Sequence, residues 1–334
     1  MIALLRSFSF SLVSTLAVIV TALYFLGWGA LFPLLILVII EVTFSFDNAI
    51  VNAQILKKMP RIWQQLFLSV GIIIAVFGMR LVFPIVMVAL TADLSWRAVL
   101  DLALNHPEQY AHKLELANPT LTAFGGAFLL MLTLHFFMAE NKQHHWLEPF
   151  ERPLQRIGRW WLPPLITVAV VAAIAQLPVN HHAAETLRAG LIGTGVYVAL
   201  HGIMMLIGKT TSKTSQLAHY TGGAAAIMFL YLEILDASFS LDGVIGAFAI
   251  TSDVLLIAAG LGAGALWVRS LTVHMVRNGT LDAYRFLEHG AHYAIAVLAA
   301  SMLVSAFFHV HEAVIGVAGV SVIAASLVAS IKRP

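Results

Sequence analysis

Cysteine is absent from this 334-residue chain, and charged residues make up only 11% of it. Without cysteine the chain has no disulfide, no thiolate metal ligand and no cysteine nucleophile. The formal net charge of +2 provides no general basic surface for a nucleic-acid partner. Hydrophobic residues account for 60% of the chain, more than the roughly 45–50% of a soluble domain. The composition therefore favours a membrane protein over a soluble enzyme.

Apolar runs of about 20 residues, the length needed to cross the hydrocarbon of a bilayer, recur along the chain. These runs are continuous rather than alternating, which favours helices over the strands of a membrane barrel. We therefore expect an all-α polytopic membrane protein embedded in a lipid bilayer. Its ten predicted spans lie near 8–28, 30–56, 64–90, 120–139, 161–178, 186–208, 223–250, 252–274, 286–307 and 311–331.

Basic residues are distributed unevenly between the two sides that ten spans would define. Fourteen of the 19 lysines and arginines fall on the side of both termini, and three fall on the opposite side. Because cytoplasmic loops carry the excess of basic residues, both termini are expected in the cytoplasm. We accordingly predict an integral protein of the inner or cytoplasmic membrane. The remaining two arginines, Arg80 and Arg269, fall inside predicted spans.

One sequence motif occurs twice, in Glu41–Ile50 and again 195 residues later in Asp236–Ile245. Both copies read acidic-x-[Thr/Ser]-Phe-Ser-[Phe/Leu]-Asp-[Asn/Gly]-x-Ile. Each is followed by a span in which a glycine precedes an arginine with eight residues between them, at Gly71 and Arg80 and at Gly260 and Arg269. The chain therefore contains an internal repeat.

The two copies lie on the second and seventh predicted spans, so they would run through the membrane in opposite directions. This predicts two inverted five-helix repeats. We divide the chain into 1–160, with spans 1–4 and a polar cytoplasmic loop at 140–160, and 161–334, with spans 5–10. By symmetry the fifth span belongs to the first repeat.

Five acidic residues lie well inside predicted spans: Glu41, Asp47, Glu233, Asp236 and Asp242. Each charge at the bilayer centre costs about 2.5–3.5 kcal/mol on insertion scales. The two arginines within spans can neutralise only two of the five carboxylates. The excess negative charge predicts a bound metal ion, protons or both.

The spacing of the acids bears on the shape of the site. Residues six apart on an ideal helix diverge by about 120°, so Glu41 and Asp47 would converge only across a break. We expect broken helices at spans 2 and 7, in the Phe-Ser-Phe and Phe-Ser-Leu stretches. The predicted ligand set is rich in oxygen, with nearby serine and threonine hydroxyls, and suits hard cations such as Mn²⁺, Mg²⁺ and Ca²⁺. Its members are Glu41, Asp47, Asn48, Glu233, Asp236 and Asp242, with Arg80 and Arg269 as ion-pair partners.

The duplicated motifs and the glycine–arginine helix that follows each copy resemble the TerC superfamily of integral membrane proteins, which is related to the LysE-type exporters. The resemblance covers spans 2–3 and 7–8 and implies manganese export or a role in tellurite resistance. It also implies that Asp47, Asn48 and Asp242 are the core positions of the site, with Glu41 and Asp236 beside them.

The residues and the resemblance together predict a secondary transporter, not an enzyme, that exports a divalent cation through a carboxylate site at the membrane midplane. Manganese is favoured, calcium or magnesium are alternatives, and proton antiport would use the leftover negative charge, with Glu233 as a ligand or proton carrier. The cation would be cargo, and no resident cofactor is expected. Two other readings stay open: a membrane metalloenzyme with paired aspartates, and a non-transporting scaffold in metal or tellurite resistance.

Overall fold

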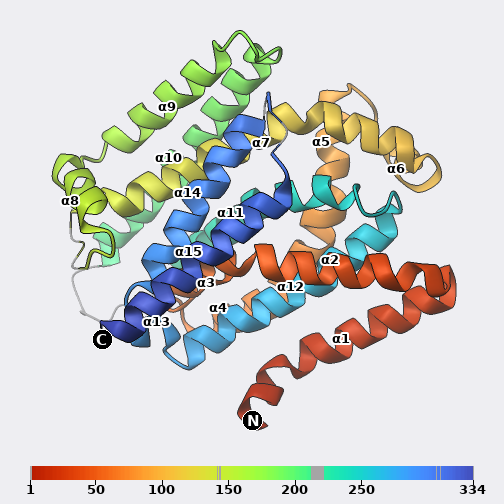
Figure 1. Ribbon diagram of the computed structural model, residues 1–334, viewed down its shortest axis with the longest axis horizontal. Helices are drawn as coiled ribbons and strands as arrows, with labels where there is room; N and C mark the ends of the chain where they lie inside the picture. The colour runs from red at the N-terminus through yellow and green to blue at the C-terminus, as the bar shows by residue number, and fades with distance from the viewer. Residues whose placement is uncertain are drawn as a thin grey trace.

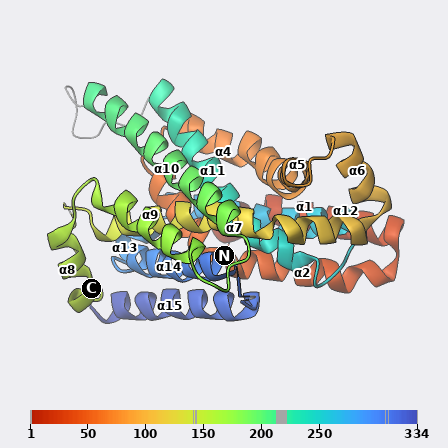
Figure 2. The ribbon, with the colours of Figure 1, turned by 90° about the horizontal axis from the view of Figure 1, so that it is seen from above.

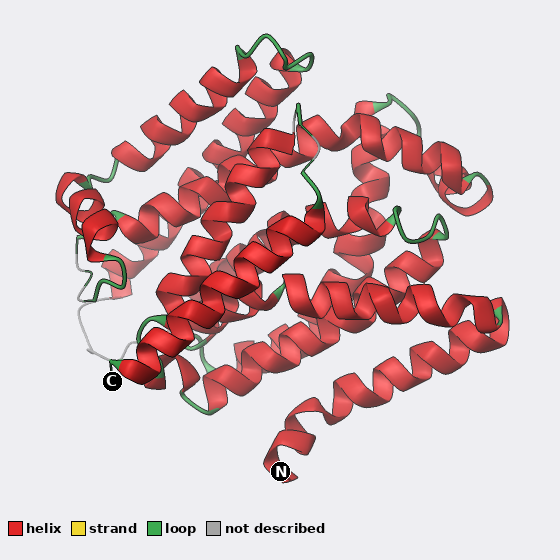
Figure 3. Cartoon of the chain, viewed as in Figure 1, coloured by secondary structure: helices red, strands yellow, loops and turns green. Residues whose placement is uncertain are grey.

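The computed structural model describes residues 2–140, 142, 144–211, 222–305, 307–308 and 310–333. Within these ranges it does not describe the side chains of 2–7, 207–211, 241, 242 and 312. The described chain consists of helices and loops, as Figure 3 shows, and contains no strand. This confirms the all-α prediction.

The helices follow the predicted apolar runs closely. In chain order they are α1 (Ile2–Leu26), the 3₁₀ turn η1 (Trp28–Ala30), α2 (Leu31–Phe44), α3 (Phe46–Leu56), α4 (Arg61–Ile73), the π-helical η2 (Ile74–Val82), α5 (Phe83–Thr91), α6 (Trp96–Asn105), α7 (Pro107–Phe137), α8 (Glu148–Ile157), α9 (Leu162–Ala175), α10 (Ala183–Thr211), α11 (Gly223–Ala247), α12 (Val254–Arg277), α13 (Thr280–Ala283), α14 (Leu287–Ser305) and α15 (Glu312–Lys332).

Eight helical segments in the described chain are long and apolar enough to cross a membrane, and α4, η2 and α5 together form one of them. Two bent pairs bring the number to ten if each pair is one span. They are α2 with α3, bent by 52°, and α8 with α9, bent by 107°. Many large apolar side chains face outward, as expected of a protein surrounded by lipid.

The elongated helices run back and forth between two ends of the molecule (Figures 1 and 2). In both views α8, α13 and the C-terminus lie at one end, and α6 lies at the other. Helix α12 packs along α2, and α7 packs against both α10 and α14. The α14–α15 hairpin covers the kink between α2 and α3. These contacts bring the two motif-bearing segments into one core.

The predicted break in the second span is confirmed, because α2 ends at Phe44 and α3 begins at Phe46. The predicted break in the seventh span is wrong, because α11 continues through Phe239 and Ser240 to Ala247. In α11 the Ser238 hydroxyl donates to the Ile234 carbonyl one turn earlier, at 3.0 Å, a local bond that a continuous helix accommodates. At the first copy the Ser45 hydroxyl donates to the Glu41 carboxylate, at 3.1 Å, whereas the hydroxyl of Ser240, the equivalent serine of α11, has no hydrogen-bond partner in the described structure.

The polar segment 140–160 and the segment 91–119 both contain helices that apolar periodicity did not predict. The first contains α8, and the second contains α6 and the beginning of α7, so the fourth predicted span starts at Pro107 rather than near residue 120. Short helices of this kind are stabilised by caps and tertiary contacts rather than by a long apolar run. Ser95, for example, caps α6 by accepting a hydrogen bond from the Ala98 amide.

Candidate functional site

The kink between α2 and α3 places the first two acids of the motif. Glu41 lies in the last turn of α2 and Asp47 in the first turn of α3, and both are buried. The Asp47 Oδ1 atom accepts a hydrogen bond from the Asn48 amide, at 2.8 Å, where the exposed N–H groups of a helix start favour a carboxylate. The two carboxylates, six residues apart, therefore line one cavity because the helix bends between them.

That cavity measures about 60 Å³. A water molecule needs about 10–15 Å³ measured in this way, so the space can hold a few waters or a partly hydrated cation. Its polar wall consists of Glu41 and Asp47 with the neighbouring residues Thr43 and Ser45. The opposite wall comes from α11, α14 and α15 and is mainly apolar, with Gly243, Phe239, Ala294, Leu298, Ile315 and Ile323 among its residues.

Arg80 neutralises Glu41. This arginine is buried in the π-helical segment η2, and its Nη2 atom donates to Glu41 Oε1 while its Nη1 atom donates to the Ala75 carbonyl at 2.6 Å. Wider π-helical turns are frequent at functional sites because they redirect side chains and free backbone acceptors.

The second copy has its own arginine. Arg269, buried in α12, donates from Nη2 to Glu233 Oε2 at 3.0 Å and to Asp236 Oδ2 at 3.1 Å. Its Nη1 atom donates to Glu233 Oε1 at 3.3 Å and to the Phe67 carbonyl at 2.9 Å. Glu233 and Asp236 share one face of α11 because they are three residues apart. One guanidinium therefore holds two carboxylates.

Asparagine side chains connect the two copies. Asn48 donates from Nδ2 to Asp236 Oδ1 at 2.7 Å, and Asn52 donates to Asn48 Oδ1 at 2.8 Å. Asn52 is buried, and its Oδ1 atom has no hydrogen-bond partner in the described structure. We did not predict Asn52 from the sequence; the available signal was an asparagine inside an apolar span, one helical turn after Asn48.

The described site residues thus form two arginine-centred ion pairs joined by Asn48, and not one ring of ligands. Among the described residues, no three acidic or histidine side chains are arranged to hold a metal ion. Asp47 differs from the other acids, because no cationic side chain in the described part of the chain contacts it. The side chain of Asp242 lies outside the described structure, although its neighbour Gly243 lines the cavity.

Glycines on two helices make room for these ion pairs. A Cβ atom at Gly71 of α4 would lie 2.3 Å from Arg269 Nη1 and 2.7 Å from Glu233 Oε1. A Cβ atom at Gly264 of α12 would lie 2.5 Å from Glu41 Cβ and 3.1 Å from the Val38 carbonyl oxygen. All four separations are shorter than ordinary van der Waals contact, so the packing around the buried charges depends on these small residues.

Gly264→Ala is therefore expected to destabilise the protein, because the Glu41 Cβ atom is close to the backbone and α2 must move to relieve the clash. Overpacking of this kind costs about 1–3 kcal/mol. Gly202→Ala in α10 is the matched control, since no atom lies within 4 Å of the added methyl group and alanine favours a helix. Thermal unfolding in nanodiscs should show a lower midpoint for Gly264→Ala only; equal midpoints would contradict the packing argument.

Comparison with known proteins identifies the family but no described relative. No curated protein and no solved structure matches the chain. One family model, described as a protein of unknown function (DUF475), matches residues 46–334. The match includes Asp47, Asn48, Arg80 and the whole second copy of the motif, and it begins after Glu41. Because it covers most of the chain, this protein belongs to the DUF475 family.

Proposed function

We propose that this protein is a secondary transporter that exports a divalent metal cation, with manganese favoured. The observation that carries the proposal is Asp47, a buried carboxylate without a cationic partner among the described side chains, facing a small cavity beside Glu41. Ionisable groups inside membrane proteins are costly and mark ion pathways and relays. A buried acid that no arginine neutralises needs a cation or a proton.

The charges of the described site support this assignment. Glu41, Asp47, Glu233 and Asp236 supply four negative charges if all are ionised, whereas Arg80 and Arg269 supply two positive charges. One divalent cation would balance the difference. The oxygen ligands of the cavity suit Mn²⁺, Mg²⁺ or Ca²⁺, and the resemblance of the duplicated motif to the TerC superfamily favours Mn²⁺.

In this mechanism the cation binds between Glu41 and Asp47, with the hydroxyls of Thr43 and Ser45 within the same wall. Asp242, adjacent to Gly243 of that cavity, is proposed as a further ligand. Arg80 stays paired with Glu41 when the cavity is empty and shares the carboxylate when the cation binds. The polar chain from Asn48 to Asp236 links the cavity to the Arg269 ion pairs, where Glu233 is proposed to carry a coupling proton.

We further propose that the two copies belong to inverted repeats that rock against each other to alternate access. Two pairings support this: Glu41 with Arg80 and Asp236 with Arg269 each join the first acid of a copy to the arginine of the span that follows it. The cavity wall formed by α14 and α15 is proposed to move away from Glu41 and Asp47 when the cation enters or leaves. The protein would lie in the cytoplasmic membrane with both termini in the cytoplasm.

Purified protein in liposomes that enclose a metal-sensitive dye tests the proposal directly. We expect Mn²⁺ to cross faster than in protein-free liposomes, and an opposing proton gradient to accelerate it. A scaffold would neither carry metal ions across the membrane nor convert a substrate. A metalloenzyme would convert a substrate without carrying metal ions across. The scaffold is the better supported second candidate, since the two arginine-centred ion pairs would also serve helix packing. Absence of flux with Mn²⁺, Mg²⁺ and Ca²⁺ would overturn the transporter assignment.

A further inference from the structure

Helix α8 is attached to the protein by its polar face. Glu151, with no exposed surface, accepts hydrogen bonds from the Leu147 amide at 3.2 Å and bonds His289 Nδ1 at 3.0 Å, and it pairs with Lys142 at 2.8 Å. Burial opposes ionisation of Glu151, but the hydrogen bonds from His289 and Lys142 outweigh it and lower its pKa to about 2. The carboxylate is therefore charged at neutral pH, and the helix is fixed to α14 through it.

A second polar residue of α8 strengthens this attachment. Gln155, one turn after Glu151, donates from Nε2 to the carbonyls of Glu140 and Lys142, at 3.0 and 3.1 Å. Its Oε1 atom lies 2.7 Å from His145 Nε2. A surface helix normally packs its apolar side inward. In α8, however, the polar residues Glu151 and Gln155 face the protein while Phe150 and Ile157 are exposed, and these outward apolar side chains need an explanation.

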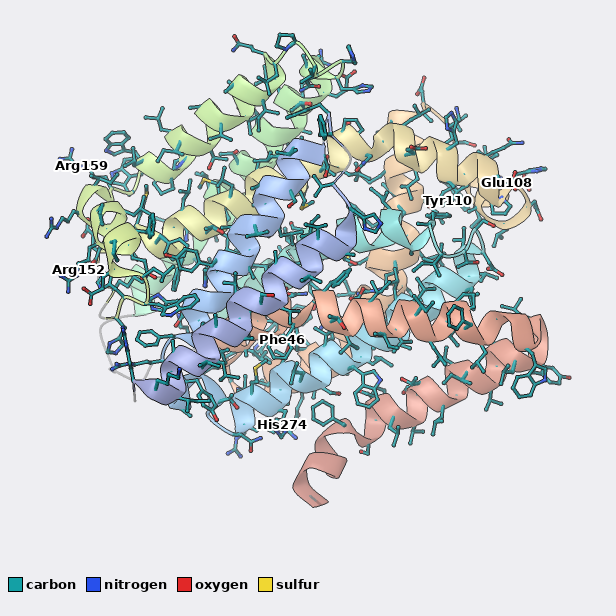
Figure 4. The ribbon with its side chains drawn as sticks, in the orientation of Figure 1. Phe46, Glu108, Tyr110, Arg152, Arg159 and His274 are labelled. Atoms are coloured by element: carbon teal, nitrogen blue, oxygen red, sulfur yellow. The ribbon has the colours of Figure 1, made fainter. Side chains whose placement is uncertain are left out.

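The outward side of α8 and the turn after it carries apolar and basic side chains together. Phe150 is 68% exposed and Trp160 83%, and Ile157 and Trp161 are also exposed. Arg152 and Arg156 are four residues apart and therefore share one face of α8, and Arg159 lies in the turn just after the helix. Arg152 pairs with Glu148 on the surface, whereas Arg156 and Arg159 have no ion-pair partner among the described side chains. Figure 4 places Arg152 and Arg159 at the outer edge of this end of the molecule.

The position of α8 matches the surface of a bilayer. It is bent by 107° from α9, the apolar helix that follows it, so it lies close to the membrane plane if α9 crosses the membrane. Both ribbon views show α8 at the periphery of one end of the bundle (Figures 1 and 2). Tryptophan and arginine at the junction with a span are typical of the headgroup region.

An apolar groove begins beside the same helix. It measures about 490 Å³ and runs between α14 and α15, and the two residues that precede α8, Trp146 and Leu147, form part of its lining. Tyr293, Val297, Ala300 and Val322 are among the other lining residues. A groove of this chemistry at the lipid-facing side of two membrane helices suits an acyl chain.

We propose that α8 is a binding site for anionic phospholipid, with the headgroup phosphate on Arg152, Arg156 and Arg159 and acyl chains against the outward apolar side chains and the adjacent groove. Guanidinium groups bind phosphate through paired hydrogen bonds, and basic side chains near an anionic bilayer are attracted to it. This site is separate from the Asp47 cavity, and it does not depend on the proposed transport.

The experiment compares lipid retention in two triple variants. Protein from membranes of phosphatidylcholine and phosphatidylglycerol is analysed by native mass spectrometry for bound phosphatidylglycerol. Arg152→Gln with Arg156→Gln and Arg159→Gln should lower its affinity by about 100-fold, because each basic residue near an anionic surface contributes about fivefold. The matched control, Arg97→Gln with Lys113→Gln and Arg188→Gln, removes equal charge from the predicted opposite side and should retain wild-type binding.

Two further measurements make the outcome decisive. Replacing Arg152, Arg156 and Arg159 by lysine keeps the positive charge and should retain most of the phosphatidylglycerol binding. Because this variant alters the same three positions, it distinguishes loss of charge from loss of folding. Brominated phosphatidylglycerol should quench Trp160 and Trp161 fluorescence more strongly than brominated phosphatidylcholine does. Equal retention of phosphatidylglycerol by the triple glutamine variant and the wild type would overturn the proposal. So would a dimer in which a second copy shields the two tryptophans from brominated lipid.

Discussion

Asp47→Asn is expected to abolish cation transport while leaving the fold intact. The substitution preserves the size of the side chain and an oxygen that can accept the hydrogen bond from the Asn48 amide. It removes the one buried carboxylate of the site that no cationic side chain in the described part of the chain contacts. Loss of one member of a buried charged interaction costs about 2–5 kcal/mol, so the initial flux of Mn²⁺ into liposomes should fall by at least about 30-fold.

The control for this experiment is Glu115→Gln, which neutralises an exposed carboxylate on α7 that does not line the cavity. It should transport like the wild type. Both variants should unfold at the wild-type temperature. If the wild type transports Mn²⁺ and Asp47→Asn transports it equally fast, Asp47 is not a ligand of the transported cation. Absent flux in the wild type would instead contradict the transporter proposal itself.

Arg269→Met is expected to cause the largest loss of stability of any single ion-pair substitution. The guanidinium contacts Glu233, Asp236 and the Phe67 carbonyl, and its Cζ atom lies 4.1 Å above the Phe67 ring. Methionine keeps much of the apolar stem but leaves two buried carboxylates without a cation. Removing one partner of a buried ion pair costs about 3–5 kcal/mol. Chemical or thermal unfolding in nanodiscs measures this change.

An exposed ion pair provides the matched comparison. Lys57 pairs with Asp282 at the surface, where both side chains are substantially exposed, and surface pairs contribute about 0–1 kcal/mol. Lys57→Met should therefore change the unfolding midpoint little. Adding Glu233→Gln to Arg269→Met should recover part of the lost stability, because it removes one of the unpaired charges. If Arg269→Met is as stable as Lys57→Met, the two acids of α11 are not charged in the folded protein.

The repeated motif could be located from the sequence because its chemistry is unusual for a membrane. Acids within apolar runs were evident at Glu41 and Asp47 and again at Glu233 and Asp236, as were the two buried arginines. The pairing of these groups follows from the high cost of isolated charge in lipid. Which acid each arginine contacts depended on helix packing: Glu233 and Asp236 share Arg269, while no cationic side chain in the described part of the chain contacts Asp47.

The break within one copy and the continuity of the other could not be predicted from the motif, because both copies share its Phe-Ser centre. Ser45 and Ser240 occupy equivalent positions, yet the chain bends at Ser45 and α11 continues through Ser240. Local sequence is similar in both, so the difference lies in the surroundings. At the first copy, Glu41 holds Ser45 and Arg80 together at the bend.

Hydrophobicity alone determined that this chain forms membrane helices, since long apolar runs have no other stable place and a helix satisfies every backbone group within itself. It determined equally that the buried acids outnumber the buried arginines. The tertiary structure decided which site carboxylate has no cation among the described side chains, how Asn48 and Asn52 link the two copies, and that α8 buries Glu151 while Phe150 and Ile157 stay exposed. Those features depend on contacts between segments up to 188 residues apart, and a local pattern of residues does not specify such distant neighbours.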